Sequence, residues 1–163
     1  NCKKRIMMNY RFYMIISTLF LVSCQSKDKK ETTSNKGMEK AALLEADKAF
    51  SKRCEEKGMK NAFIEYIDSN GVLLRPGQLP IIGANAIDYL IQQNDSGYTL
   101  SWEPSNGEVC QSGELGYTYG IYAMRPASKD TLIYGTYTSI WKKQKDGSWK
   151  FVLDTGNEGI GDQ

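Results

Sequence analysis

The sequence contains no histidine, which removes the most common general base, the usual switch of charge near neutral pH and the most frequent metal ligand. Its four cysteines form no Cys-x-x-Cys pair, so a structural zinc site is not expected either. We therefore predict neither a metal centre nor a bound cofactor. Any catalysis would have to use Asp, Glu, Tyr, Lys, Arg or Cys side chains.

The apolar run from Phe12 to Val22 is too short to cross a bilayer comfortably. It follows Arg11 and has the length of a signal-peptide core, so it is typical of a targeting segment. The first residue is not Met, and we expect translation to start at Met7 or Met8. An ordinary secretory signal and an uncleaved anchor are the alternatives.

The run ends in Leu21-Val-Ser-Cys24, which resembles a bacterial lipoprotein signal, where cleavage precedes the cysteine and its thiol is acylated. We therefore expect residues 1–23 to be a signal peptide and Cys24 to be lipidated, because two or more acyl chains hold a protein stably at a membrane. Residues 25–37 are polar, and residues 24–38 are expected to form the lipidated cysteine and a flexible tether. The expected location is the bacterial cell envelope, on the periplasmic side of the outer membrane.

A basic surface is also lacking. The whole chain has 21 basic and 19 acidic residues, a net charge of +2. Four basic residues lie in 1–23, and another four, with two acidic ones, lie in 24–38, so residues 39–163 keep 13 basic and 17 acidic residues, a net charge of −4. A mildly acidic domain without a basic stripe argues against nucleic acid as a partner.

Residues 39–163 predict one domain in which helices precede long antiparallel strands. The strongest local signal is Lys145-Asp-Gly-Ser148, an Asp-Gly turn between two aromatic-rich runs, which predicts a β-hairpin. Pro104 to Gly107 predicts a bulge in an earlier strand. The expected helices are 38–57, with an apolar stripe of Leu43, Ala46, Phe50 and Cys54, then 60–66, and then 83–93, which is capped by Asn85 and buries Ile87, Leu90 and Ile91. The expected strands are 72–76, 98–109, 114–124, 131–144 and 149–155. A turn is expected at 68–71 and a loop at 77–82.

This order favours an α+β fold with helices packed on one face of a curved sheet. The chain resembles the NTF2-like superfamily of cone-shaped α+β proteins, and within it the SnoaL-like/DUF4440 group. The matching stretches are 41–57, 62–77, 83–87, 100–104, 112–122 and 135–156. The resemblance implies a deep pocket between the helices and the concave sheet face. Since the superfamily includes ketosteroid-isomerase-like enzymes, dehydratases, cyclases, epoxide hydrolases and proteins that only bind or associate, it implies fold better than function.

In such enzymes the resemblance implies a carboxylate or histidine base, with Tyr or protonated acid groups holding a developing oxyanion. Here there is no histidine, and Gly58 and Asn70 stand where relatives often carry acidic residues, so an isomerase site is in doubt. Asp154, an acid inside a hydrophobic strand, is the best candidate for a catalytic carboxylate. It could instead lie on the solvent face or cap a neighbouring segment.

Arg75 could bind an anionic ligand group, or it could pair internally with Asp154 or Glu103, which we favour. Glu103 should point away from its neighbour Trp102 by strand alternation. The candidate pocket walls, each of which could equally be core or sheet surface, are Trp102, Tyr117, Tyr119 and Tyr137. Cys54 and Cys110 could form a disulfide outside the cytoplasm, or they could remain separate buried thiols.

The favoured function is a membrane-anchored envelope protein whose NTF2-like pocket binds a small hydrophobic or weakly acidic molecule. One alternative is a ketosteroid-isomerase-like or dehydratase-like enzyme that uses a pocket carboxylate and Tyr. A second alternative is a protein-association module, in which the open sheet face forms a homodimer or docks an envelope partner. A pocket lined by Trp102, Tyr residues and Arg75, with an acid of raised pKa, would favour a small-molecule binder or enzyme, whereas a cavity filled by side chains behind an exposed apolar sheet face would favour association.

Overall fold

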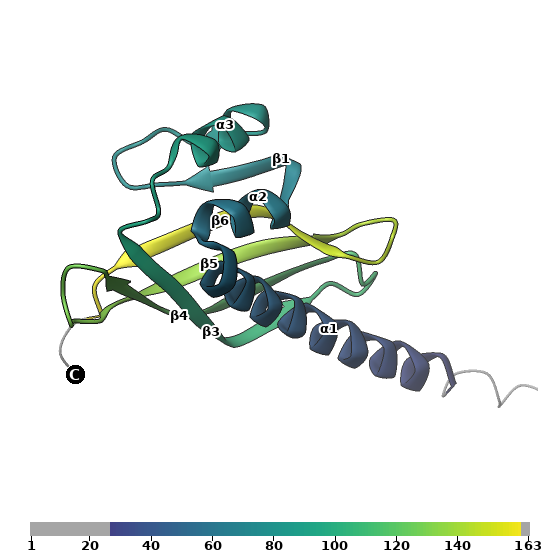
Figure 1. Cartoon of the computed structure of the whole chain (residues 1–163). Coiled ribbons are helices and arrows are strands. Elements are labelled where there is room, and N and C mark those ends of the chain that lie inside the picture. Colours follow the sequence, from purple (N-terminus) through teal and green to yellow (C-terminus); the bar gives the residue numbers. More distant parts are fainter. Residues whose placement is uncertain (1–26, 161–163) are drawn as a thin grey trace, which may run out of the picture.

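The structure is a computed structural model that describes residues 27–160, with side chains from Lys36 onward. The expected signal peptide and the lipidation of Cys24 lie outside the described residues and stay predictions. Three helices pack against a single six-stranded sheet, as the α+β prediction requires (Figure 1). Within residues 27–160, none of the helices combines the length and the apolar character that crossing a bilayer requires.

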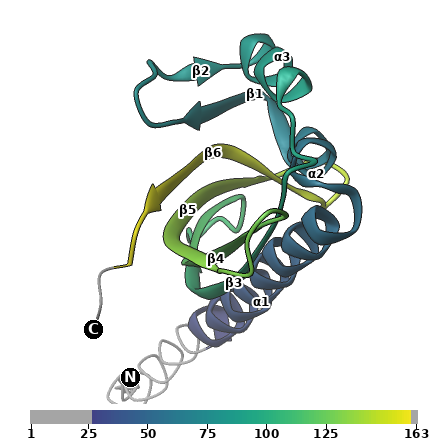
Figure 2. The same ribbon diagram turned by 60° about the vertical axis from the view of Figure 1, so that its left-hand side comes forward.

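The first helix, α1, spans Lys27–Lys57 and lies across the concave side of the sheet (Figures 1 and 2). It begins at Lys27 rather than at residue 38, so much of the segment expected to be a flexible tether is helical. No proline interrupts this stretch, and both Lys36 and Lys40 form ion pairs with Glu108 on the sheet, which hold the early turns in place. The helix ends at Lys57 and is followed by Gly58, whose φ of 82° suits a residue without a side chain.

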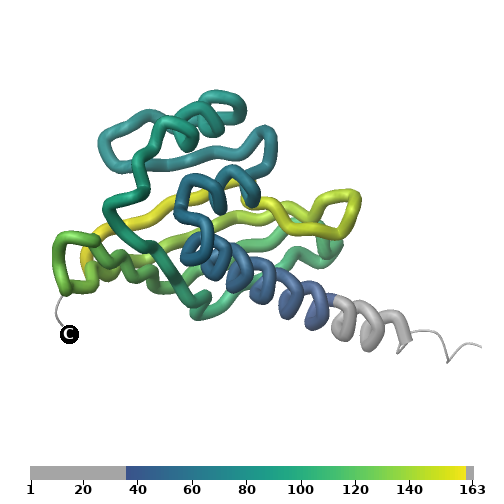
Figure 3. The backbone as a smooth tube through the Cα atoms, in the orientation of Figure 1, coloured from purple at the N-terminus to yellow at the C-terminus, as the bar shows by residue number. Residues whose placement is uncertain are grey.

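The sheet has the order β2-β1-β6-β5-β4-β3, with β1 parallel to β6 and every other pair antiparallel. Figure 3 shows the chain passing from α1 through α2 into β1 and returning through α3 to β3. The remaining elements are α2 (Met59–Tyr66), β1 (Ile67–Leu74), β2 (Ile81–Ile82), α3 (Ala84–Gln92), β3 (Tyr98–Val109), β4 (Leu115–Pro126), β5 (Ile133–Lys143) and β6 (Trp149–Glu158).

Two sequence predictions are wrong in the region around β1. The expected turn at 68–71 belongs to β1, where the register with β6 shifts between Ile67 and Val72. This irregularity accommodates the turn-like sequence, and Gly71 is needed there because a Cβ would collide with the Ile67 side chain. The expected loop at 77–82 contains the short strand β2, which pairs with β1.

Helix α3 also differs from expectation at its start. Its N-cap is Gly83, with a φ of 58° and no side-chain cap, so the predicted cap by Asn85 is wrong. The backbone N–H of Gly83 instead donates to the carbonyl of Gly71, and this contact sets where the helix begins. Ala86 and Leu90 are its buried residues, whereas Ile91, expected to be buried, is exposed.

The predicted hairpin is confirmed as β5 and β6, with Gly147 in the turn at a φ of 86°. The predicted bulge is also confirmed, because the β3–β4 register shifts between Pro104 and Asn106. Bulges of this kind increase the twist of a strand and help to curve the sheet.

The core lies between α1 and the concave sheet face and is centred on the Phe50 ring. Its centroid lies 4.7–5.9 Å from those of five other aromatic rings, which are Phe63, Tyr66, Trp102, Trp141 and Phe151. Trp141 and Phe151 are fully buried, so the hairpin serves mainly as architecture. The aromatic core leaves a cavity beside Trp102 and Phe63.

Candidate functional site

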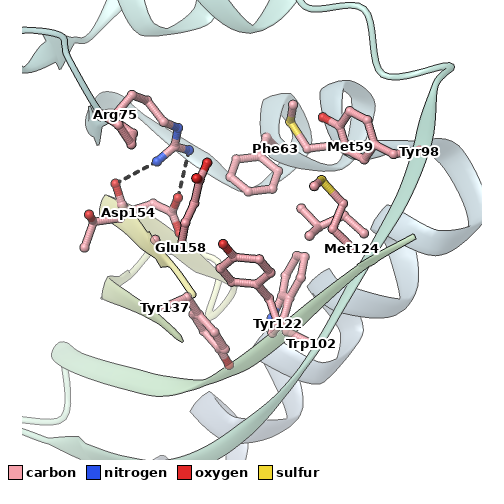
Figure 4. Close-up of a pocket in the computed structure, with 14 residues that line it drawn as sticks. Met59, Phe63, Arg75, Tyr98, Trp102, Tyr122, Met124, Tyr137, Asp154 and Glu158 are labelled. Atoms are coloured by element: carbon pink, nitrogen blue, oxygen red, sulfur yellow. Dashed lines mark hydrogen bonds and ion pairs between the residues drawn. The ribbon is translucent and has the colours of Figure 1, made fainter. Parts of the chain in front are cut away.

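The cavity has a volume of about 270 Å³, is open to solvent and is lined by residues of α2, of the segment directly after β1 and of strands β3 to β6. One side is apolar and one end is polar (Figure 4). The apolar side includes Met59, Phe63, Leu100, Trp102 and Met124, and the polar end includes Arg75, Asp154, Glu158 and the Tyr122 hydroxyl. A pocket with one charged end and an aromatic side suits a small, largely apolar ligand that carries one polar group.

Arg75 and Asp154 form the polar end through an internal ion pair. Arg75 Nη2 donates to Asp154 Oδ1 at 2.9 Å, while Nη1 donates to the backbone carbonyls of Leu74 and Asp154. Asp154 Oδ2 accepts a hydrogen bond from Ser139 Oγ at 2.8 Å. The favoured pairing of Arg75 is therefore confirmed with Asp154. The alternative partner Glu103 is exposed and pairs with Lys48.

Parallel pairing of β1 with β6 brings these two residues together, since Leu73 lies beside Asp154 in the sheet. Asp154 is only 7% exposed, so the interpretation that placed it on the solvent face is wrong. Its side chain contributes to the pocket wall as the sequence analysis considered. Both of its carboxylate oxygens already accept a hydrogen bond, which makes it a holder of Arg75 rather than a free base.

Arg75 retains donors that can reach a ligand. A guanidinium has five N–H groups, and the three contacts above use both on Nη1 and one on Nη2. Among the described residues, Nε–H and the second Nη2–H have no acceptor. The Arg75 side chain is 20% exposed and its guanidinium lies 5.7 Å from the centre of the Phe63 ring. Two fixed donors therefore remain at the boundary between the polar end and the aromatic side.

Tyr122 adds a third donor at the same end. Its hydroxyl points toward Asp154 and Glu158 in Figure 4 and has no hydrogen-bond partner in residues 36–160. Burial, and then the charge of Glu158, raise the pKa of Tyr122, so the phenol stays neutral and can donate. Its ring packs over Gly135, its partner in the neighbouring strand, where any side chain would collide with it.

Tyr117 and Tyr119 do not line the pocket. They lie on the outer face of β4, each 44% exposed, and stack on each other there. The inward face of this strand carries Thr118 and Tyr122 instead. Thr118 is fully buried and accepts a hydrogen bond from the Trp141 indole at 2.8 Å, so this face of β4 packs into the core.

Trp102 and Tyr137 do line the pocket, as expected, and a carboxylate that the sequence analysis missed lies behind them. Asp47 of α1 is 0% exposed and accepts hydrogen bonds from Trp102 Nε1 at 2.8 Å and from Tyr137 Oη at 2.7 Å. Burial raises the pKa of Asp47, and these hydrogen bonds partly oppose the shift. The signal was present in the sequence, because Asp47 falls at helical spacing between Leu43 and Phe50 of the apolar stripe.

The two cysteines of the domain do not form a disulfide. Cys54 is buried in α1, and burial raises the pKa of its thiol to about 12. Cys110 is exposed after β3, where hydrogen bonds from Ser112 and from the backbone of Leu115 lower its pKa to about 7. The alternative of two separate thiols holds, although only Cys54 is buried. In residues 27–160 no group of three potential metal-ligating side chains comes together.

Comparison with known proteins supports the fold. No family model and no curated protein matches the chain. Among solved structures, a ketosteroid isomerase-like protein from Erwinia carotovora atroseptica is 15% identical with a TM-score of 0.59, over 76% of this chain and 98% of that one. An NTF2-like protein with a cystatin-like fold from Novosphingobium aromaticivorans is 13% identical with a TM-score of 0.64, over 86% and 94% of the two chains.

A third solved structure, an epoxide hydrolase from M. tuberculosis described as LEH-like, is 12% identical with a TM-score of 0.52, over 74% of this chain and 81% of that one. Identities this low show a shared fold and leave the chemistry of each pocket to its own residues. The narrower SnoaL-like/DUF4440 grouping stays a prediction. The order of elements, the curved sheet and the structural matches agree that this chain has the α+β cone fold of the NTF2-like superfamily.

Proposed function

We propose that this protein binds a small, flat, largely apolar molecule that carries an acidic oxygen, such as an aromatic carboxylate. The observation that carries the proposal is that Arg75 keeps two N–H groups without acceptors in residues 36–160, beside an aromatic wall. The Tyr122 hydroxyl faces the same end (Figure 4). Charge-assisted hydrogen bonds from a fixed guanidinium are strong and directional, so they would orient the acidic group while the rings pack on Trp102 and Phe63.

Binding is favoured over catalysis because the pocket offers no desolvated carboxylate that is free to act as a base. Asp154 is held by Arg75 and Ser139, so both of its carboxylate oxygens are already engaged in hydrogen bonds. Asp47 lies behind the Trp102 and Tyr137 rings rather than in the pocket lining. Glu158 lines the polar end but is exposed to solvent, so it is not a desolvated carboxylate of the kind that serves as a base in such pockets.

The association module is supported only by the outer sheet face, where Leu115, Tyr117, Tyr119 and Ile121 are each about half exposed. The open pocket and its unused donors favour binding.

The test compares 2-naphthoate with 2-naphthylmethanol, which share the two-ring system and differ in the charge of the oxygen group. Titration calorimetry should give at least about tenfold tighter binding of the carboxylate, because charge-assisted hydrogen bonds contribute more than neutral ones. Equal affinities would contradict recognition by Arg75. Failure of both compounds to bind would contradict the proposed class of ligand.

We also propose that the domain is held at a membrane surface through acylated Cys24, on the basis of Leu21-Val-Ser-Cys24 in the sequence. The Cys24→Ser variant should then move from the detergent-rich phase to the aqueous phase when cell extracts are partitioned. Retention of that variant in the detergent-rich phase to the same extent as wild type would contradict lipid anchoring at this residue.

A further inference from the structure

Asp47 is a buried acid at a position where the helix would otherwise carry an apolar side chain. It lies one turn from Leu43 and from Phe50, both of which are at most 1% exposed. Among the described residues it has no Lys or Arg partner, so the fold must bury this group without a neutralising charge. A leucine would continue the stripe without that penalty, but it would leave the Trp102 indole and the Tyr137 hydroxyl without an acceptor. The acid is therefore accounted for by the two aromatic side chains that it binds.

Its contacts indicate what the acid does. Oδ1 accepts from the Trp102 indole and Oδ2 accepts from the Tyr137 hydroxyl, so each oxygen holds one aromatic side chain by its polar end. The two ring centroids lie 5.9 Å apart with an interplanar angle of 59°. In Figure 4 the Tyr137 hydroxyl points away from the cavity, while both rings contribute to its lining. Asp47 thus binds two pocket-lining side chains from the side opposite the cavity.

The other contacts of Trp102 and Tyr137 restrain these two rings only in part. The Trp102 backbone N–H donates to Ser51 Oγ at 2.8 Å, which fixes its main chain to α1 but leaves the ring angle to other contacts. The Tyr137 ring packs beside Gly120, where a Cβ would come within 2.9 Å of it. Packing limits each ring, and the hydrogen bond to Asp47 selects one orientation among those that packing allows.

We propose that Asp47 is a positioning residue of the pocket, which holds Trp102 and Tyr137 in the orientation that a flat ring system needs for stacking. This inference rests on the proposed function, because it explains why the wall of that same site is fixed. It adds a specificity element to the site, since rigid aromatic walls discriminate a flat ring from a bulky or saturated one.

Two substitutions separate hydrogen bonding from shape and charge. In Asp47→Asn, the amide oxygen can still accept from the Trp102 indole, and the amide nitrogen can donate to the Tyr137 oxygen. In Asp47→Leu, the volume is similar but both ring groups lose their partner and can reorient. The matched control is Leu43→Ala, one turn earlier on the same stripe, because Leu43 packs against Gly116 and does not line the pocket.

The experiment measures 2-naphthoate affinity and ¹⁵N relaxation of the Trp102 indole in the whole chain, under conditions where each variant is folded. Asp47→Leu should weaken 2-naphthoate binding by about tenfold or more and increase the motion of the Trp102 indole, whereas Asp47→Asn should stay within about threefold of wild type. Leu43→Ala should lose stability but keep the wild-type affinity and indole motion.

The proposal is overturned if the Trp102 indole in Asp47→Leu is as rigid as in wild type, or if Leu43→Ala weakens binding as much as Asp47→Leu does. If 2-naphthoate does not bind wild-type protein, the proposed function fails, and the indole relaxation still decides whether Asp47 positions Trp102. If Asp47→Leu cannot be folded, Tyr137→Phe keeps the ring and removes only its bond to Asp47. That variant should weaken 2-naphthoate binding, and unchanged affinity together with unchanged Trp102 motion would contradict the proposal.

Discussion

Arg75→Met is expected to weaken the binding of 2-naphthoate by about 100-fold, measured by titration calorimetry on folded protein. Loss of one partner of a desolvated, hydrogen-bonded charge pair typically costs about 2–5 kcal/mol, and about 2.7 kcal/mol corresponds to this change in affinity. Methionine keeps an apolar stem beside Phe63, so the aromatic wall should remain. Affinity for neutral 2-naphthylmethanol should therefore change much less than affinity for the carboxylate.

The substitution also removes the partner of Asp154, which is 7% exposed and would then depend on Ser139 alone. Unfolding should accordingly become easier by about 3–5 kcal/mol. Asp154→Asn provides the matched control, because its amide oxygen can still accept from Arg75 while the competing negative charge is gone. That variant should bind 2-naphthoate as tightly as wild type or more tightly. A similar loss of affinity in both variants would show collapse of the pocket instead of anion recognition.

Phe50→Ala is expected to lower the free energy of unfolding by about 3–5 kcal/mol, as judged from denaturant titration. Phe50 is 1% exposed, and its ring lies against five other aromatic rings. Truncation would leave a cavity that the rigid sheet cannot close, and it would remove the edge contacts to Trp102 and Trp141 as well as dispersion energy.

Ile121→Ala is the control for Phe50→Ala, since this side chain is 47% exposed on the outer face of β4. It should lower the free energy of unfolding by less than about 1 kcal/mol. If the two variants lose the same stability, the core is not centred on Phe50 as the ring geometry indicates.

The fold could be predicted because its signals are local. The Asp-Gly turn before Ser148 identified the hairpin, and Pro104 identified the bulge. The start of α1 and the path of residues 68–71 could not be predicted in the same way. Long-range contacts decide them, namely the ion pairs of Glu108 with α1 and the pairing of β1 with β6.

The site was only partly predictable for a related reason. Strand alternation shows that Tyr119 and Tyr122 lie on opposite faces of the sheet, but the sequence does not show which of the two faces packs against α1. The pair of Arg75 and Asp154 depends on a parallel contact between segments that are far apart in the chain. Asp47 was not predicted as a site residue because an acid within an apolar stripe resembles a solvent-exposed position, although its helical spacing places it in the core.

The most direct measurement is a crystal structure of the wild-type protein with 2-naphthoate bound. The carboxylate should lie about 3 Å from the Arg75 nitrogens that have no acceptor in residues 36–160, with the rings against Trp102. The Tyr122 hydroxyl should face the carboxylate from the same end. A ligand whose carboxylate points to solvent, or whose rings lie outside this cavity, would contradict the account.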